Sequence, residues 1–185
     1  MLWKKIWLKK VGTEDLKPLW EVSYGPKADL KWMEFDGPYF EDSVLTWEEF
    51  TTGWGKTAVN DSHRNLMLVG NKIVGIVTAY WEDGNLKQWL EIGIAIYDAD
   101  YWGKGIGHFA LRLWYQQLFE MYPYLPHIGF TTWSGNIGMQ KAGEKSGMRE
   151  EGRIRKVRFW KNHYFDSVKY GILRDELSQY DLNGD

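Results

Sequence analysis

Three glycines at alternate positions separate a strand-like run from a helical pattern, and they are Gly103, Gly105 and Gly107. The run before them, residues 91–97, is mostly apolar and leads into an acidic turn at 98–100. From 108 to 119, apolar residues recur at three- and four-residue steps, as on one face of a helix. Glycines leave no side chain above the backbone, so an anionic group can reach the free N–H groups of the first helical turn. The sequence therefore predicts a strand–loop–helix unit that binds a phosphate group.

Composition narrows the class of protein. The 185 residues suffice for one domain with a full core, and 44% hydrophobic and 26% charged residues are ordinary globular values. A net charge of -2 without a basic arm predicts no direct nucleic-acid binding. The chain has no cysteine, which excludes disulfides and thiol nucleophiles and fits a cytoplasmic protein. The four histidines are scattered, and we expect no metal site.

Membrane association is also not expected. No run of the sequence approaches the roughly 18 apolar residues that a membrane-spanning helix needs. The first ten residues contain four lysines and are too charged for the apolar part of a signal peptide.

Turn and cap residues predict the order β-α-α-β-β-β-α-β-α-β-β. Helices are predicted from Thr13, as an N-cap, to about residue 22, from Thr46, and over 136–146. The remaining predictions are strands at 2–11, 66–69, 72–77, 89–97 and 128–133, hairpin turns at 70–71 and 83–84, and a closing hairpin of 153–160 with 164–173. This order indicates an α/β (α+β) fold with a mixed, mostly antiparallel sheet of about seven strands and about four helices. We expect one domain over residues 1–174 and a frayed polar tail over 175–185.

Other nucleotide-binding loops fit the glycines poorly. A Walker A loop needs Gly-x-x-x-x-Gly-Lys-[Ser/Thr], which residues 103–107 do not supply. The dinucleotide fingerprint Gly-x-Gly-x-x-Gly would need a third glycine at His108. A glycine-rich turn without a ligand is the remaining alternative, although three glycines weaken a helix start by about 1 kcal/mol each relative to alanine.

The loop resembles the acetyl-coenzyme A pyrophosphate loop of the GNAT superfamily of N-acetyltransferases, Arg/Gln-x-x-Gly-x-Gly/Ala. The similar segment here is Trp-Gly-Lys-Gly-Ile-Gly at 102–107, after an Ile-Gly-Ile-Ala-Ile strand. Residues 132–139 and 144–148 resemble the second binding block, an asparagine followed by "EK-x-G-hydrophobic", and 166–173 resemble the last strand of the RimJ/RimL-like branch. The resemblance covers nearly the whole chain and implies a GNAT-like sheet splayed between its fourth and fifth strands.

The resemblance also implies the cofactor and its ligands. Acetyl-coenzyme A would bind with its pyrophosphate on the glycine loop and its pantetheine arm along the fourth strand, like an added strand. The implied cofactor-binding residues are Ile94, Ala95, Ile96, Trp102, Gly103, Lys104, Gly105, Ile106, Gly107 and Asn136. Trp102 replaces the family's Arg or Gln, but that position mostly contributes a backbone N–H, so we expect binding to survive. Lys104 is equally consistent with a solvated loop lysine, and Asn136 with a simple helix cap.

Transfer to an amine needs a base, because most amines are protonated at pH 7. Glu91 is our first candidate, since it begins the strand that would carry the thioester, with Asp166 second. A structural carboxylate is the alternative for each.

Gly93 has two interpretations: it forms a bulge that splays the strand, or it is a plain packing glycine. Met139 stands where some RimJ/RimL enzymes carry a serine thought to protonate the leaving thiolate. That proton would then come from a tyrosine, with Tyr97, Tyr101 and Tyr164 as unranked candidates, or from water.

The first two helices wall the acceptor groove in this family, and residues 28–50 hold seven acids, one lysine and interleaved aromatics. Such a wall favours a cationic amine: a peptide N-terminus, a polyamine or an aminoglycoside. A solvated acidic face over packed aromatics is the alternative. The candidate acceptor-binding residues are Trp32, Glu34, Tyr39 and Glu41. The many aromatic residues are compatible with a homodimer.

Two functions follow from this resemblance. The first is an acetyl-coenzyme A dependent N-acetyltransferase in which the amine attacks directly in a ternary complex. The second is a catalytically weak or inactive acyl-coenzyme A binding sensor on the same fold, which Met139 and the uncertain base motivate.

Overall fold

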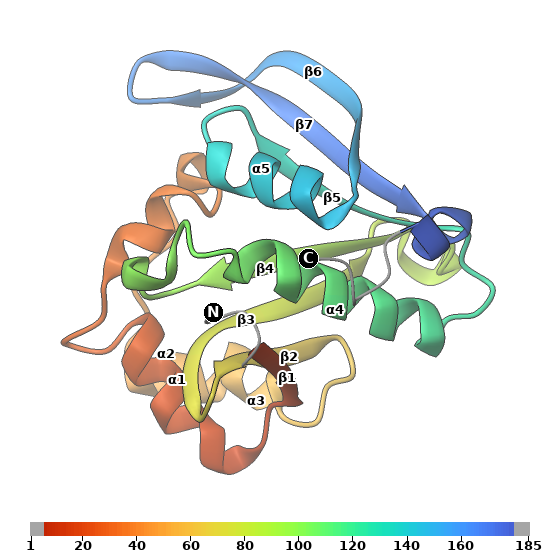
Figure 1. The fold of residues 1–185 in the computed structure, drawn as a ribbon. Coiled ribbons are helices and arrows are strands. Elements are labelled where there is room, and N and C mark those ends of the chain that lie inside the picture. Colours follow the sequence, from red (N-terminus) through yellow and green to blue (C-terminus); the bar gives the residue numbers. More distant parts are fainter. Residues whose placement is uncertain (1–5, 180–185) are drawn as a thin grey trace.

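The computed structural model describes residues 6–179, and it contains a seven-stranded sheet with the order β1-β2-β3-β4-β5-β7-β6 (Figure 1). All neighbouring strands pair antiparallel except β4 and β5, which are parallel. The strands are β1 (Ile6–Lys10), β2 (Arg64–Val69), β3 (Lys72–Trp81), β4 (Leu90–Ile96), β5 (His127–Trp133), β6 (Arg149–Trp160) and β7 (His163–Leu173). The mixed, mostly antiparallel sheet predicted from the sequence is confirmed.

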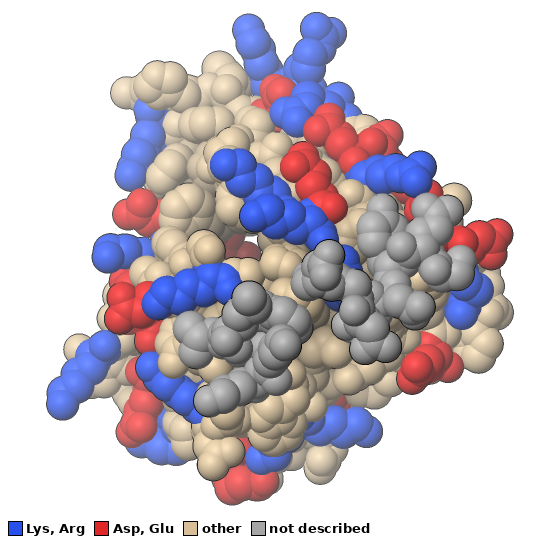
Figure 2. Space-filling model, viewed as in Figure 1, with Lys and Arg blue, Asp and Glu red and all other residues tan. Residues whose placement is uncertain are grey.

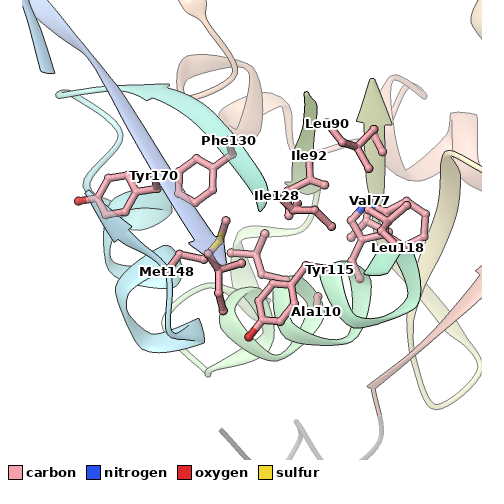
Figure 3. Packing of buried hydrophobic residues seen from close by; sticks show 14 of the residues in the cluster. Val77, Leu90, Ile92, Ala110, Tyr115, Leu118, Ile128, Phe130, Met148 and Tyr170 are labelled. Atoms are coloured by element: carbon pink, nitrogen blue, oxygen red, sulfur yellow. The ribbon is translucent and has the colours of Figure 1, made fainter. Parts of the chain in front are cut away.

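Within residues 6–179, five α-helices cover the two faces of the sheet. They are α1 (Leu16–Ser23), α2 (Trp47–Thr52), α3 (Trp54–Ala58), α4 (Ile106–Met121) and α5 (Ile137–Ser146). On one face, α4 buries its apolar stripe against β3, β4 and β5, as seen for Ala110, Tyr115 and Leu118 (Figure 3). On the other face, a second cluster packs helices α1, α2 and α3 against the sheet. It includes Leu19, Phe50 and other buried side chains. In the described part of the chain, no helix has the length and apolar character that a membrane crossing requires.

The sheet divides along one line, between β4 and β5. These strands pair only at Leu90 with Ile128 and at Glu91 with Gly129, after which they separate. Residues 94–96 of β4 keep their partners on β3, but among the described strands none pairs with the other edge of this segment. The register of β3 with β4 runs without a shift through Gly93, so no bulge occurs there. A Cβ at Gly93 would lie 2.6 Å from Thr78 Oγ1, which identifies it as a packing glycine.

Local signals gave most of the element boundaries. Thr46 caps α2 in a capping box with Glu49, and Gly147 ends α5 with φ of 100°. The closing hairpin turns at Lys161 and Asn162, which both have positive φ, as a tight two-residue hairpin turn requires.

Two boundary predictions are wrong, at Thr13 and in the C-terminal tail. Thr13 does not cap the first helix; Asp15 accepts from the Gly12 N–H at 2.8 Å and is held by Lys9, and a 3₁₀ turn precedes α1. The hairpin predicted at 83–84 does form between β3 and β4, and a 3₁₀ turn (Gly84–Leu86) lies within its connection. Part of the predicted tail is ordered, because Arg174–Gln179 forms a 3₁₀ helix and Glu176 accepts from the Leu173 N–H and pairs with Arg149. Residues 180–185, and 2–5 of the predicted first strand, lie outside the described residues.

Candidate active site

The glycine loop leaves the N-terminal turn of α4 open. Gly103 and Gly105 have φ of 69° and 84°, the left-handed region that favours glycine. A Cβ at Gly103 would meet no atom within 4 Å, so the space above the loop is free. Among residues 6–179, no carbonyl accepts a backbone hydrogen bond from the N–H groups of 103–108. These amides and the positive end of the α4 dipole fit the binding of a diphosphate.

A groove of about 360 Å³ extends from this loop along the free edge of β4. Its lining includes nine of the ten residues predicted to bind the cofactor: Ile94, Ala95, Ile96, Trp102, Gly103, Gly105, Ile106, Gly107 and Asn136. Lys104 is exposed and does not line the groove. The splayed β4 edge, the bare amides and the groove therefore lie together, as a strand-like pantetheine arm with a terminal diphosphate would require.

Trp102 fixes the loop on the end of β4. Its indole Nε1 donates to the Ile96 carbonyl at 2.9 Å, and its ring packs edge-on against Phe35, with centroids 5.4 Å apart. The residue that replaces the family's Arg or Gln thus holds the loop through its side chain, a role that the motif did not reveal.

Asn136 uses both ends of its side chain within the protein. Its Oδ1 accepts from the Met139 N–H at 2.9 Å, which caps α5, and its Nδ2 donates to the Phe35 carbonyl at 3.1 Å. The Trp133 indole donates to the same carbonyl at 3.0 Å. Asn136 lines the groove and also ties the 28–46 segment to the start of α5.

Basic side chains border the groove on the α5 side. Lys141 and Lys145 line it one helical turn apart, together with His108 from α4. Burial lowers the pKa of His108, and the charges of Arg112 and Lys145 lower it further. Figure 2 shows a hollow between the start of α4 and α5 with Lys and Arg side chains around it. These lysines were not predicted as site residues, although their i, i+4 spacing after the asparagine block was a signal.

Glu91 lies where β4 leaves β5, and only 2% of it is exposed. Its Oε1 accepts from Lys169 Nζ at 3.0 Å, and its Oε2 accepts from the Tyr80 and Thr131 hydroxyls at 3.0 and 2.7 Å. Glu91 does not line the groove directly. The carboxylate therefore sits at the apex of the splay in a satisfied polar network.

Asp166 occupies a different environment on β7. Its carboxylate accepts from the Lys156 N–H at 3.0 Å and from Arg153 at 3.3 Å. The hydrogen bond from Lys156 lowers the pKa of Asp166, and Arg153 adds to the effect. The Arg153 and Lys156 bonds tie Asp166 to the irregular part of β6, and Asp166 lines neither the groove nor the cavity described next.

A second cavity of about 350 Å³ adjoins the groove, and the two share Trp32 and Asp36 in their linings. Of the predicted acceptor residues, Trp32, Glu34 and Glu41 line this cavity, whereas Tyr39 packs outside it against Phe40 and Trp133. Asp36, which the sequence analysis did not single out, belongs to both walls. Burial raises the pKa of the Asp36 carboxyl, and the negative charge of Asp42 raises it further.

The three tyrosines considered as proton donors are separated by the fold. Tyr101 lines the groove, Tyr97 is buried against Trp32, and Tyr164 is exposed on the closing hairpin. Met139 also lines the groove. In the described part of the chain, no cluster of three or more His, Asp or Glu side chains is arranged to hold a metal ion.

Comparisons with known proteins agree with this geometry. The family model "Acetyltransferase (GNAT) domain" matches residues 5–149, so the chain belongs to the GNAT acetyltransferase family. This membership supports acetyl-coenzyme A as the cofactor. A search of curated proteins gave no match.

Solved structures share the fold at low sequence identity. A GNAT-family acetyltransferase from Bacillus anthracis has a TM-score of 0.74 and 22% identity, with 93% of this chain and 96% of that chain covered. The aminoglycoside acetyltransferase AAC(6')-Ib, in complex with ribostamycin and coenzyme A, has a TM-score of 0.75 and 16% identity, covering 97% and 99%. Spermidine N-acetyltransferase from Vibrio cholerae, with coenzyme A and spermine, has a TM-score of 0.73 and 18% identity, covering 95% and 99%.

Proposed function

We propose that this protein transfers an acetyl group from acetyl-coenzyme A to a primary amine by direct attack in a ternary complex. The observation that carries the proposal is the junction of the two cavities. A groove that ends in bare amides at α4 meets an acidic, aromatic cavity at Trp32 and Asp36. A thioester and an amine bound in these two spaces would meet at their shared wall.

Different segments of the chain would bind the two parts of the cofactor. The amides of the glycine loop would hold the pyrophosphate, and the free edge of 94–96 would pair with the pantetheine arm. Acetyl-coenzyme A supplies the activated acetyl group as a thioester. A backbone N–H of the same β4 segment can donate to the thioester carbonyl oxygen, where negative charge develops during attack.

We infer that Glu91 is the general base and that it acts through water. Its carboxylate is buried where β4 leaves β5, three residues before the groove-lining segment 94–96, although Glu91 does not itself line the groove. The ammonium group would lose one proton to Glu91 through water. The neutral nitrogen would then attack the thioester carbonyl and lose a second proton to solvent as the carbon–sulfur bond breaks. Tyr101, the only one of the three candidate tyrosines in the groove, can return a proton to the departing sulfur. The Asp166 carboxylate already holds together the β6–β7 hairpin, so we assign it a structural role.

The acceptor is a peptide N-terminus or a small cationic amine, and the final strand at 166–173 supports placement in the RimJ/RimL-like branch. Two structural neighbours are bound to cationic amines, ribostamycin and spermine. These complexes support an amine acceptor for this chain without fixing which one.

Release of coenzyme A thiol from acetyl-coenzyme A in the presence of an amine panel tests the activity. We expect Glu91→Gln to lower kcat by about 100-fold or more with the KM for acetyl-coenzyme A unchanged, as for loss of a general base. Lys169→Met is the matched control, because it breaks the same ion pair but keeps the carboxylate. An equal loss of kcat in both variants would show that the ion pair, not the base, matters.

The rival function is a coenzyme-binding module without catalysis. The satisfied bonds of Glu91 and the presence of Met139 in the groove favour it. Tight binding of acetyl-coenzyme A with no thiol release from any peptide, polyamine or aminoglycoside would establish this rival.

A further inference from the structure

The cavity beside the groove has an unusual charge balance. Among its described lining residues, four are acidic and none is Lys or Arg; the acids are Glu34, Asp36, Glu41 and Asp42. Arg158, whose guanidinium carbon lies 4.9 Å from the centroid of the Tyr39 ring, is not part of the lining. The cavity therefore collects negative charge without an internal counter-charge.

These four carboxylates also lack protein partners. Within residues 6–179, none of them forms an ion pair or accepts a side-chain hydrogen bond. Other acids of the same segment are bonded: Asp29 accepts from the Lys31 N–H, and Glu49 accepts from the Thr46 N–H. Glu48, outside the cavity, also has no partner for its carboxylate among residues 6–179, so four of the five unpaired acids of residues 28–50 line the cavity.

Negative charges in the cavity lie close enough to affect the pKa values of neighbouring groups. Burial raises the pKa of Asp36, and the charges of Asp36 and Asp42 add to the effect of burial in raising the pKa of Tyr24 to about 12. The negative charge of Asp42 contributes to the raised pKa of Asp36, and a bound cation would offset this repulsion. All four acidic residues are exposed, so an ammonium group can reach their carboxylates from solvent.

The remaining walls suit an aliphatic chain bearing charges. Tyr24, Trp32 and Trp160 offer aromatic faces, which attract ammonium groups and pack against methylene groups. A volume of about 350 Å³ lies at the small end of the range of about 300–1,000 Å³ for small-molecule sites. A slender molecule fits this space better than a multi-ring amino sugar.

We propose that the acceptor is a linear aliphatic diamine or polyamine that places one ammonium among Glu34, Glu41 and Asp42 while another amine reaches the groove past Trp32 and Asp36. This proposal rests on the proposed function, since it names the acceptor of the same transfer. A singly charged amine or a peptide N-terminus would leave the outer carboxylates without a partner.

Matched amines test the two-point binding. Thiol release is measured with n-butylamine, 1,4-diaminobutane and spermidine at fixed acetyl-coenzyme A. We expect kcat/KM for spermidine to exceed that for n-butylamine by about tenfold or more, because charge-assisted bonds are strong and a tenfold change needs only one of them. Asp42→Asn and Glu41→Gln should reduce this preference severalfold each, mainly through KM. Glu48→Gln is the control, since Glu48 is exposed in the same segment, outside the cavity.

Each outcome decides the question. Equal kcat/KM for mono- and diamines, or an equal loss of preference in Glu48→Gln, would overturn the proposal, and so would a preferred aminoglycoside. If no amine is turned over, calorimetry with spermidine is run on the protein saturated with coenzyme A. Spermidine binding that weakens in Asp42→Asn but not in Glu48→Gln then supports the site while the transfer function fails. No spermidine binding overturns both.

Discussion

The groove and the acidic cavity are neighbours that share Trp32 and Asp36, yet they are built in opposite ways. The groove uses regular elements, the edge of β4 and the first turn of α4, and offers backbone amides. The cavity uses the 28–46 segment, whose regular structure is limited to the 3₁₀ turns at Leu30–Glu34 and Pro38–Phe40, and offers side-chain carboxylates. Backbone donors tolerate most side-chain changes nearby, whereas carboxylates can change with single substitutions. This difference suits a protein that keeps one cofactor and adapts its acceptor.

The largest effect should come from closing the groove at its glycine loop. We expect Gly105→Val to weaken coenzyme binding by more than about 100-fold. A β-branched residue at φ of 84° costs about 1–2 kcal/mol, and its Cβ would crowd His108 at 3.2 Å and the amides beside it. Calorimetry with coenzyme A measures the loss.

Gly70→Val is the matched control for this substitution. Gly70 has φ of 61° in the turn between β2 and β3, and no atom lies within 4 Å of its Cβ position. It should lose similar stability but keep coenzyme affinity. Unchanged affinity in Gly105→Val would contradict the assignment of the loop.

A smaller effect is expected from loosening the loop rather than blocking it. Trp102→Phe keeps an aromatic ring near Phe35 but removes the hydrogen bond to the Ile96 carbonyl. One such bond contributes about 0.5–1.5 kcal/mol, so the KM for acetyl-coenzyme A should rise about two- to tenfold. Trp7→Phe removes a comparable indole–carbonyl bond, to Gly70, at 2.7 Å. A rise in KM in both variants would point to general destabilisation.

The smallest expected effect is on thermal stability, and it comes from Asp36 in the acidic cavity. Because the pKa of Asp36 is raised in the folded protein, the folded state binds more protons than the unfolded state between the two pKa values. Ionised Asp36 therefore destabilises the fold, and this penalty develops as pH rises from about 4, near the unfolded value, through the folded pKa.

Asp36→Asn should accordingly raise Tm at pH 7–8 and lose this advantage near pH 4. The gain should stay below about 4 °C, since 1 kcal/mol corresponds to about 2–4 °C for a domain of this size. Thermal scans of both proteins from pH 4 to 8 measure it, with Glu48→Gln as the exposed control. A Tm difference that is constant with pH would refute the coupling of Asp36 to its surroundings.

Prediction from sequence succeeded where the information is local. The left-handed glycines, the capping box at Thr46 and the turn at 161–162 are properties of short segments. It failed at Thr13, because Lys9 on β1 holds Asp15 and so changes how the helix begins. It also missed Asp36, because nothing in a single acid of a mixed segment distinguishes it from its neighbours.

The 28–46 segment shows why the remaining features of the site could not be predicted from the sequence. Its position depends on the Phe35 carbonyl, which accepts from Trp133 and Asn136, 98 and 101 residues away. The environment of Glu91 likewise depends on Lys169, 78 residues further along the chain. Such contacts follow from the packing of the whole sheet, and no window of sequence contains them.

The sequence by itself determined the glycine turn, the amphipathic face of α4 and the order of strands and helices, since backbone preference and apolar periodicity act over a few residues. Tertiary structure alone decided that β4 would part from β5 at Glu91 and that Trp32 and Asp36 would stand between two cavities. Hydration and charge depend on what surrounds a group in space, so the chemical character of these carboxylates appears only after the chain has folded.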